Sequence, residues 1–141
     1  MKIGNCFLAM GLLLFLNSDL TYSQANSDCL TCHEQKDFTK TTPAGKIKSL
    51  YVDQKKFESS IHGQLDCIAC HTDLSGAEFP HQENVGPVDC GVCHSQVSEV
   101  YSGSLHGQAV KTGAKLAPRC WDCHGSHDIS SVQSPDSKVG R

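Results

Sequence analysis

The stretch CWDCH at residues 120–124 decides how this chain can fold, because it is the last of four copies of one pattern. The other copies are CLTCH (29–33), CIACH (67–71) and CGVCH (90–94). In every copy two residues separate a pair of cysteines, and a histidine follows the second cysteine directly. We number these copies motifs 1 to 4 in chain order. A short chain that repeats one signature four times carries four copies of one kind of site.

The spacing within each motif is that of covalent c-type haem attachment. Two thiols at this spacing can add to the two vinyl groups on one haem edge, and the histidine that follows can then bind the iron. The sequence therefore predicts four covalently attached c-type haems. Their thioether bonds are expected at Cys29, Cys32, Cys67, Cys70, Cys90, Cys93, Cys120 and Cys123, and their proximal iron ligands at His33, His71, His94 and His124.

Three other uses of paired cysteines fit this arrangement less well. Eight cysteines in an exported chain ordinarily indicate a disulfide framework, and zinc ribbons also use paired C-x-x-C. Only the gap from Cys70 to Cys90 lies in the zinc-ribbon range, and zinc gives no reason for a histidine after every pair. A thioredoxin-like centre places one such pair in a larger strand–helix fold. Haem attachment explains all four motifs.

Four histidines lie outside the motifs, which equals the number of sixth iron ligands that four haems need. These residues are His62, His81, His106 and His127. Methionine, the usual alternative ligand, occurs only at Met1 and Met10, close to the start of the chain. The sequence therefore predicts two histidine ligands at every iron.

Two of these histidines sit in a repeated setting. FESSIHG (57–63) and YSGSLHG (101–107) share an aromatic residue, a serine, an aliphatic residue, His and Gly at the same positions. The aromatic and aliphatic residues are four apart, so they lie on one helical face. We expect two short helices that pack on a porphyrin, deliver a distal histidine and end at Gly63 and Gly107 as C-caps. Two unrelated helix ends are the alternative.

The segment CHGSHDI, which starts at Cys123, restricts the role of His127. Two ligands on opposite faces of one haem have Cα atoms roughly 12 Å apart, whereas three residues span at most about 10–11 Å. His127 therefore cannot complete the haem that His124 binds, and it must reach a neighbouring haem. The spacing of His62 and His81 leaves both free to pair with any haem.

The start of the chain has the pattern of a secretory signal peptide. A single lysine precedes an apolar run from Ile3 to Leu16, and Ser23-Gln24-Ala25 places small residues around a cleavage point. An uncleaved membrane anchor is the alternative, but the run of 14 residues is shorter than the roughly 20 that cross hydrocarbon. We expect residues 1–25 to be removed and the mature protein not to be an integral membrane protein.

The expected mature chain, residues 26–141, is a single tetrahaem domain that is poor in apolar side chains. Its 116 residues include 22 Leu, Ile, Val, Phe and Met, a fraction at the composition threshold for disorder. Such a chain has too few apolar side chains to form a core of its own, and the haems can provide that core. We expect a mostly irregular fold with short α-helices and little or no sheet, wrapped around four haems.

Charge is distributed unevenly along the chain. Residues 34–56 form a polar connector that has a turn at Pro43-Ala44-Gly45 and carries six lysines against three acids. Residues 57–110 contain seven acids and no lysine or arginine. A solvated face is the ordinary interpretation, although such asymmetry can also orient docking to redox partners. Residues 130–141 have the composition of a flexible tail, and nothing indicates nucleic-acid binding.

With four C-x-x-C-H motifs, two S-[IL]-H-G segments and the ending CWDCHGSHDI, the chain resembles the small tetrahaem cytochromes of anaerobic respiratory bacteria. The resemblance covers most of residues 27–130 and implies a periplasmic or cell-surface electron carrier with closely packed haems. It also implies redox partners: a quinol-oxidising or cytochrome b-type membrane donor, and periplasmic or outer-membrane acceptor cytochromes. The C-x-x-C-K motif of multihaem nitrite reductases is absent from the sequence.

We therefore expect an electron-transfer protein rather than an enzyme, with low haem potentials because no methionine ligand raises them. Two alternatives remain open. A small oxidoreductase subunit would need one open iron, so one of the four spare histidines would have to be free. A subunit of an extracellular cytochrome filament would self-associate, with one distal histidine completing a haem in the next molecule.

Overall fold

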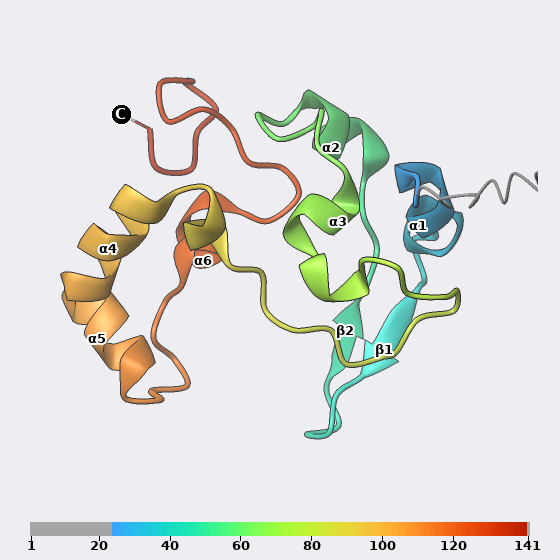
Figure 1. The fold of residues 1–141 in the computed structure, drawn as a ribbon, viewed down its shortest axis with the longest axis horizontal. Coiled ribbons are helices and arrows are strands. Elements are labelled where there is room, and N and C mark those ends of the chain that lie inside the picture. The colour runs from blue at the N-terminus through green and yellow to red at the C-terminus, as the bar shows by residue number, and fades with distance from the viewer. Residues whose placement is uncertain (1–23, 141) are drawn as a thin grey trace, which may run out of the picture.

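The computed structural model describes residues 24–140, so nearly all of the expected signal peptide, residues 1–23, lies outside the described residues. Short helices joined by long loops dominate this part of the chain (Figure 1). No helix in it is long and apolar enough to cross a membrane. The expectation of a mostly irregular fold with short helices and little sheet is confirmed. The helices are α1 (Asn26–His33), α2 (Gln54–Ser59), α3 (Cys67–Cys70), α4 (Ser95–Gly103), α5 (Leu105–Lys111) and α6 (Cys120–His124), with 3-10 turns η1 (Thr72–Leu74) and η2 (Cys90–Val92).

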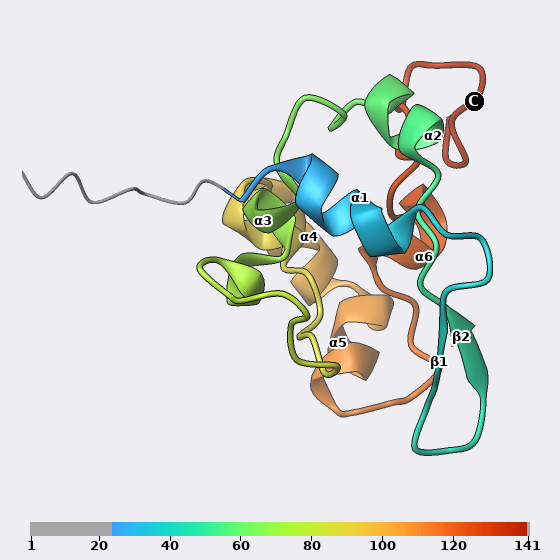
Figure 2. The ribbon, with the colours of Figure 1, turned by 90° about the vertical axis from the view of Figure 1, so that its right-hand side faces the viewer.

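The sheet is one small antiparallel hairpin inside the lysine-rich connector. It pairs β1 (Thr39–Thr41) with β2 (Ile47–Ser49), and Lys40 lies opposite Lys48. Gly45, with φ of 74°, closes the turn at Pro43-Ala44-Gly45. Figure 2 shows the hairpin extending away from the helices.

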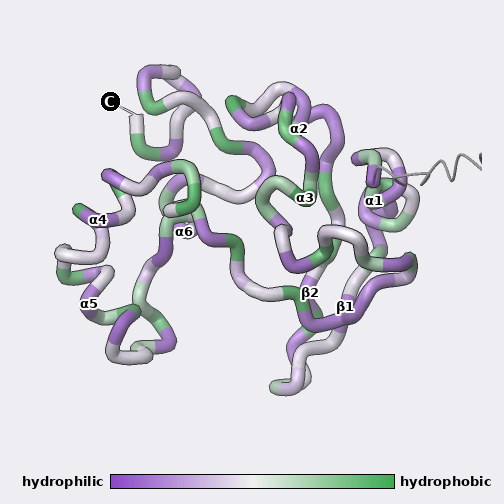
Figure 3. The backbone as a smooth tube through the Cα atoms, viewed as in Figure 1, coloured by the Kyte–Doolittle hydropathy of each residue, from purple (hydrophilic) through white to green (hydrophobic). Residues whose placement is uncertain are grey.

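The described residues contain no buried hydrophobic side chain. Large apolar side chains are exposed instead, among them Val100 at 77%, Leu105 at 89% and Leu116 at 97%. In Figure 3 the apolar segments are scattered along the tube and do not gather in one place. A folded domain ordinarily packs such side chains against one another. Residues 24–140 therefore do not build an apolar core from their own side chains.

Gln24 fastens the start of the described chain to the loop after η1. Its amide nitrogen donates to the carbonyl oxygens of Leu74 at 3.0 Å and Ala77 at 2.9 Å, and its amide oxygen accepts from the Gly76 N–H at 2.7 Å. Only 7% of the residue is exposed. Cleavage after Ala25, as the sequence predicts it, would remove these three hydrogen bonds.

The two S-x-H-G stretches fold alike, but their helix boundaries differ from the prediction. Helices α2 and α4 both end before the histidine, at serines in extended conformation: Ser60 has φ −72° and ψ 163°, and Ser104 has φ −75° and ψ 166°. Each serine N–H donates to the carbonyl of the aromatic residue three positions earlier, at 2.9 Å in both copies. His62 therefore lies in a turn between α2 and α3, and His106 lies in the first turn of α5.

Gly63 and Gly107 are not helix C-caps, because neither has the positive φ of such a cap. Each glycine instead lies against the end of the preceding helix. An added Cβ at Gly107 would collide with the carbonyl oxygen of Tyr101, and one at Gly63 would collide with that of Phe57. The repeat thus preserves a close backbone approach that only glycine allows.

Gly107→Ala is expected to destabilise the holoprotein by about 1–3 kcal/mol, the usual cost of forcing extra atoms into a packed position. Gly103→Ala is the matched control, since a Cβ there meets no atom within 4 Å and alanine favours a helix by up to about 1 kcal/mol over glycine. Thermal unfolding of the two variants would test this. Equal melting temperatures would contradict the role assigned to the close approach.

The C-terminal segment, residues 130–140, folds back on the chain through turns. Lys138 forms an ion pair with Asp128 at 2.9 Å. The hydrogen bond from Lys138 lowers the pKa of the Asp128 carboxyl below its usual range. That residues 130–141 form a flexible tail stays a prediction.

Candidate haem-binding sites

Each C-x-x-C-H motif begins on a short helical turn. Motif 1 occupies the end of α1, motif 2 begins with α3, motif 3 begins with η2, and motif 4 coincides with α6. One helical turn brings residues three apart to the same face, so both thiols of a motif lie on one side of the turn. In all four motifs the first cysteine is half-buried and the second is exposed. The four sites therefore share one local geometry.

Thiols from different motifs lie next to one another. The Cys67 thiol lies near the Cys29 thiol, and the Cys90 thiol near the Cys120 thiol. Burial raises the pKa of Cys67 to about 11, and the neighbouring Cys29 adds to this increase. Burial also raises the pKa of Cys90, with further contributions from Cys120 and Cys70.

A structural zinc ion needs four cysteine or histidine ligands around one point. The described residues contain no group of three or more His, Cys, Asp or Glu placed to hold a metal ion. All eight cysteines between Cys29 and Cys123 are free thiols. They remain available for bonds to a haem.

Six of the eight histidines lie as three facing pairs. The ring centres of His33 and His81 are 6.0 Å apart, those of His62 and His94 5.8 Å, and those of His71 and His127 6.2 Å. The angles between the ring planes are 3°, 59° and 31°, respectively. Every pair joins one motif histidine to one histidine outside the motifs.

The three ring spacings fit two imidazoles that share a metal ion. With a metal–nitrogen bond of about 2 Å on each side, the centres of two such rings are about 6 Å apart. Direct ring contact would not require three pairs at this common distance, each with a motif histidine. The histidine geometry therefore fits an iron held between the two rings of each pair.

Backbone carbonyls orient the rings of the first pair. The Nδ1 atom of His33 lies 2.7 Å from the Leu50 carbonyl oxygen, and that of His81 lies 2.7 Å from the Gln82 carbonyl oxygen. A carbonyl can only accept, so Nδ1 must carry the proton and donate it. The Nε2 lone pair of each ring is then free to bind a metal, the usual arrangement for a histidine ligand.

The third pair is held in the neutral form. Burial lowers the pKa of His71 and of His127, and the proximity of His71 lowers that of His127 further. The neutral imidazole is the form that binds a metal. The Nδ1 atom of His71 is buried without a hydrogen-bond partner, so this ring has a polar atom that the surrounding side chains do not satisfy.

The last two histidines, His106 and His124, form no ring pair in the described structure. His106 is exposed in the first turn of α5, and His124 is half-buried at the end of α6. Tyr101, at the end of α4, donates a hydrogen bond of 2.7 Å to the carbonyl of Pro118, two residues before Cys120. This bond links the helix that precedes His106 to the segment that leads into motif 4.

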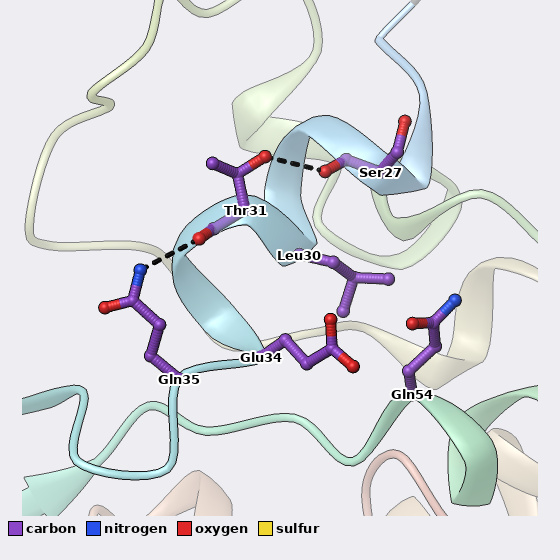
Figure 4. A pocket seen from close by; sticks show the side chains of 6 residues that line it. All are labelled: Ser27, Leu30, Thr31, Glu34, Gln35 and Gln54. Atoms are coloured by element: carbon purple, nitrogen blue, oxygen red, sulfur yellow. Dashed lines mark hydrogen bonds between the residues drawn. The ribbon is translucent and has the colours of Figure 1, made fainter.

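Of the two hollows described next, only one includes a candidate iron ligand. One hollow of about 460 Å³ lies beside α1 and is lined by polar side chains and Leu30 (Figure 4). It contains neither cysteine nor histidine, so it is not a candidate haem site. A second hollow of about 240 Å³ is lined in part by Tyr51, Lys56 and His127. Solvent can reach His127 through this second hollow.

Comparisons with known proteins agree with this geometry. Residues 36–139 match the sequence model of the class III cytochrome c family. The high-molecular-weight cytochrome c of Nitratidesulfovibrio vulgaris Hildenborough is 29% identical over 122 residues, which cover 74% of this chain and 20% of that protein. The chain thus spans about a fifth of the length of this curated relative. No solved structure matches the chain significantly.

Proposed function

Because this chain belongs to the class III cytochrome c family, we propose that it carries electrons through four bis-histidine c-type haems in anaerobic respiration. Class III cytochromes c are electron-transfer proteins and not enzymes, and cytochromes c bind their haem covalently. When bound, each haem iron alternates between the ferric and ferrous states and so holds or releases one electron. The proposal also specifies the number of haems, their histidine ligands and their low reduction potentials.

The facing histidine pairs are the observation that carries the proposal. They favour His33 with His81 at motif 1, His71 with His127 at motif 2, and His94 with His62 at motif 3. His124 and His106 are left for motif 4. An iron with two histidine ligands has no open position for a substrate, so this ligand set suits electron transfer and not catalysis.

Haem burial also accounts for the missing core. The exposed apolar side chains of η2 and of the helices that follow motif 3 include Val92, Val97, Val100 and Leu105. Four porphyrins offer apolar surface on which such side chains can pack. Each Å² of apolar area removed from water stabilises the folded state by about 25 cal/mol. The chain then needs no apolar core of its own.

Partners and location follow from the same proposal. Class III cytochromes c are periplasmic, so we propose export through the N-terminal signal peptide. We further propose that a membrane quinol-oxidising or cytochrome b-type protein donates electrons and that other cytochromes accept them. The lysines of residues 34–56 and the acids of residues 57–110 would orient the docking of these proteins.

The test is a count of haems and of iron spin states. The intact mass of the purified holoprotein should exceed that of the bare chain by four haem groups. Electron paramagnetic resonance of the oxidised protein should show only low-spin ferric iron. Fewer than four haems, or a high-spin signal in the parent protein, would overturn the four-haem bis-histidine proposal.

A further inference from the structure

The first residue of the described chain, Gln24, is built into the folded domain. It is the only buried polar residue within residues 24–140, with 7% of its surface exposed. Its amide nitrogen donates to the carbonyl oxygens of Leu74 and Ala77, and its amide oxygen accepts from the Gly76 N–H. Both donors of the amide are therefore used. Burial with paired donors is typical of a structural residue in a folded domain.

Gln24 binds a tight turn in the segment that connects motif 2 to the histidine facing motif 1. The Ala77 N–H donates to the Leu74 carbonyl at 3.0 Å, and Gly76 has a φ of 75°. Residues 74–77 thus form a turn with the positive φ at its third position that a type II turn requires. Gln24 contacts three of the four residues of this turn. Without it, the Gly76 N–H would lose its partner within the chain.

The next residue, Ala25, caps α1. Its N–H donates to the Asp28 carboxylate at 3.0 Å, and the Asp28 N–H donates to the Ala25 carbonyl at 3.0 Å. A cut after Ala25 would remove both bonds together with those of Gln24. It would also place a new α-ammonium group on Asn26, the first residue of α1, where the helix dipole disfavours positive charge. The start of α1 is therefore complete only when Ala25 is retained.

The sequence contains a second cleavage pattern two residues earlier. Thr21-Tyr22-Ser23 has compact side chains at its first and third positions, the same spacing as in Ser23-Gln24-Ala25. Both patterns fit the small residues that a signal peptidase requires before its cut. The two products differ only in whether Gln24 and Ala25 remain. A cut after Ser23 preserves the bonds of both residues and leaves the new ammonium group two residues before α1.

We propose that a signal peptidase cuts the chain after Ser23, and that the mature protein uses Gln24 to fasten its N-terminus to the turn of residues 74–77. Water adds across the Ser23–Gln24 peptide bond, which leaves a carboxylate on Ser23 and a free amine on Gln24. The cut lies two residues before the one expected from the sequence alone. This inference rests on the proposed export, and it does not depend on the number of haems.

The first test is tandem mass spectrometry of the holoprotein, expressed from the full chain in a host that attaches c-type haem and purified from its periplasm. The N-terminal peptide should begin at Gln24, with its amide intact or cyclised with loss of ammonia. Any other start, Asn26 included, would overturn the inference. The haem count comes from the intact mass of the same sample. A start at Gln24 with fewer than four haems would therefore refute the four-haem proposal alone.

The second test measures whether Gln24 holds the turn. Gln24→Ala removes the three hydrogen bonds and should lower the melting temperature of the holoprotein by about 4–8 °C, the effect of losing one buried hydrogen-bonding group in a small domain. Gln35→Ala is the matched control, because Gln35 is exposed and makes one side-chain bond, to the Thr31 carbonyl at 2.9 Å. It should have a much smaller effect. Equal melting temperatures, with the same start in both variants, would overturn the role of Gln24.

Discussion

Replacing Cys67 and Cys70 together with alanine is expected to abolish cooperative unfolding of the whole domain. The described residues bury no hydrophobic side chain, so under the proposed function a haem at motif 2 would supply core that no side chain replaces. Domains of this size are stable by only about 5–15 kcal/mol. Losing one of four haems removes an apolar area worth a large part of that stability.

Motif 2 is a sensitive place for such a loss because two other segments, α1 and residues 126–129, depend on it. Asn26 bonds to the Cys67 backbone, the Cys29 thiol lies near the Cys67 thiol, and His127 faces His71. The loss should therefore spread to motif 1 and to the segment that follows motif 4. Without haem 2, neither the start of α1 nor residues 126–129 keeps its partner.

Thermal melts of the purified holoproteins, followed by circular dichroism and by haem absorbance, would measure this effect. Ile47→Ala is the control, since Ile47 is 76% exposed on the hairpin and should change stability by no more than about 0.5 kcal/mol. If the double cysteine variant melts cooperatively at the parent temperature, the core of the protein lies elsewhere.

Local features of the sites could be predicted from the sequence because they depend on short-range spacing. Cys67, Cys70 and His71 lie within five residues, so one helical turn fixes their relation whatever the rest of the chain does. The two S-x-H-G stretches fold alike for the same reason, because the residues of each stretch lie close together in the sequence. What the sequence did not predict is the reason for Gly63 and Gly107, because their role depends on where the previous helix ends.

The pairing of distal histidines could not be predicted, because it depends on contacts between distant segments. His62 and His94 are separated by 32 positions, and His71 and His127 by 56, so chain length permits many pairings. Steric reach restricted only His127, which is three residues from His124. The Asn26 side chain bridges α1 to α3, and a single asparagine outside any motif carries no signal of such a contact.

His127→Ala is expected to convert one iron to the high-spin state while all four covalent haems remain. The attachment cysteines are unchanged, so the mass should still show four haems. The lost ring lies 6.2 Å from that of His71, and alanine offers no nitrogen to replace it. The open iron should therefore belong to motif 2 and not to motif 4, although His127 is only three residues from His124.

Carbon monoxide provides the measurement, since it should bind the reduced variant at one haem and the parent protein at none. The hollow lined by Tyr51, Lys56 and His127 would be enlarged by the substitution and would admit the gas. Ser126→Ala, a change at the exposed neighbour, should bind none, and His106→Ala should open the haem of motif 4 instead. In the carbon monoxide complex of His127→Ala, the shifted proton signals should be those of the thioether bonds at Cys67 and Cys70. Shifted signals at Cys120 and Cys123 would mean that His127 serves the haem of His124, and the limit set by the three-residue reach would be wrong.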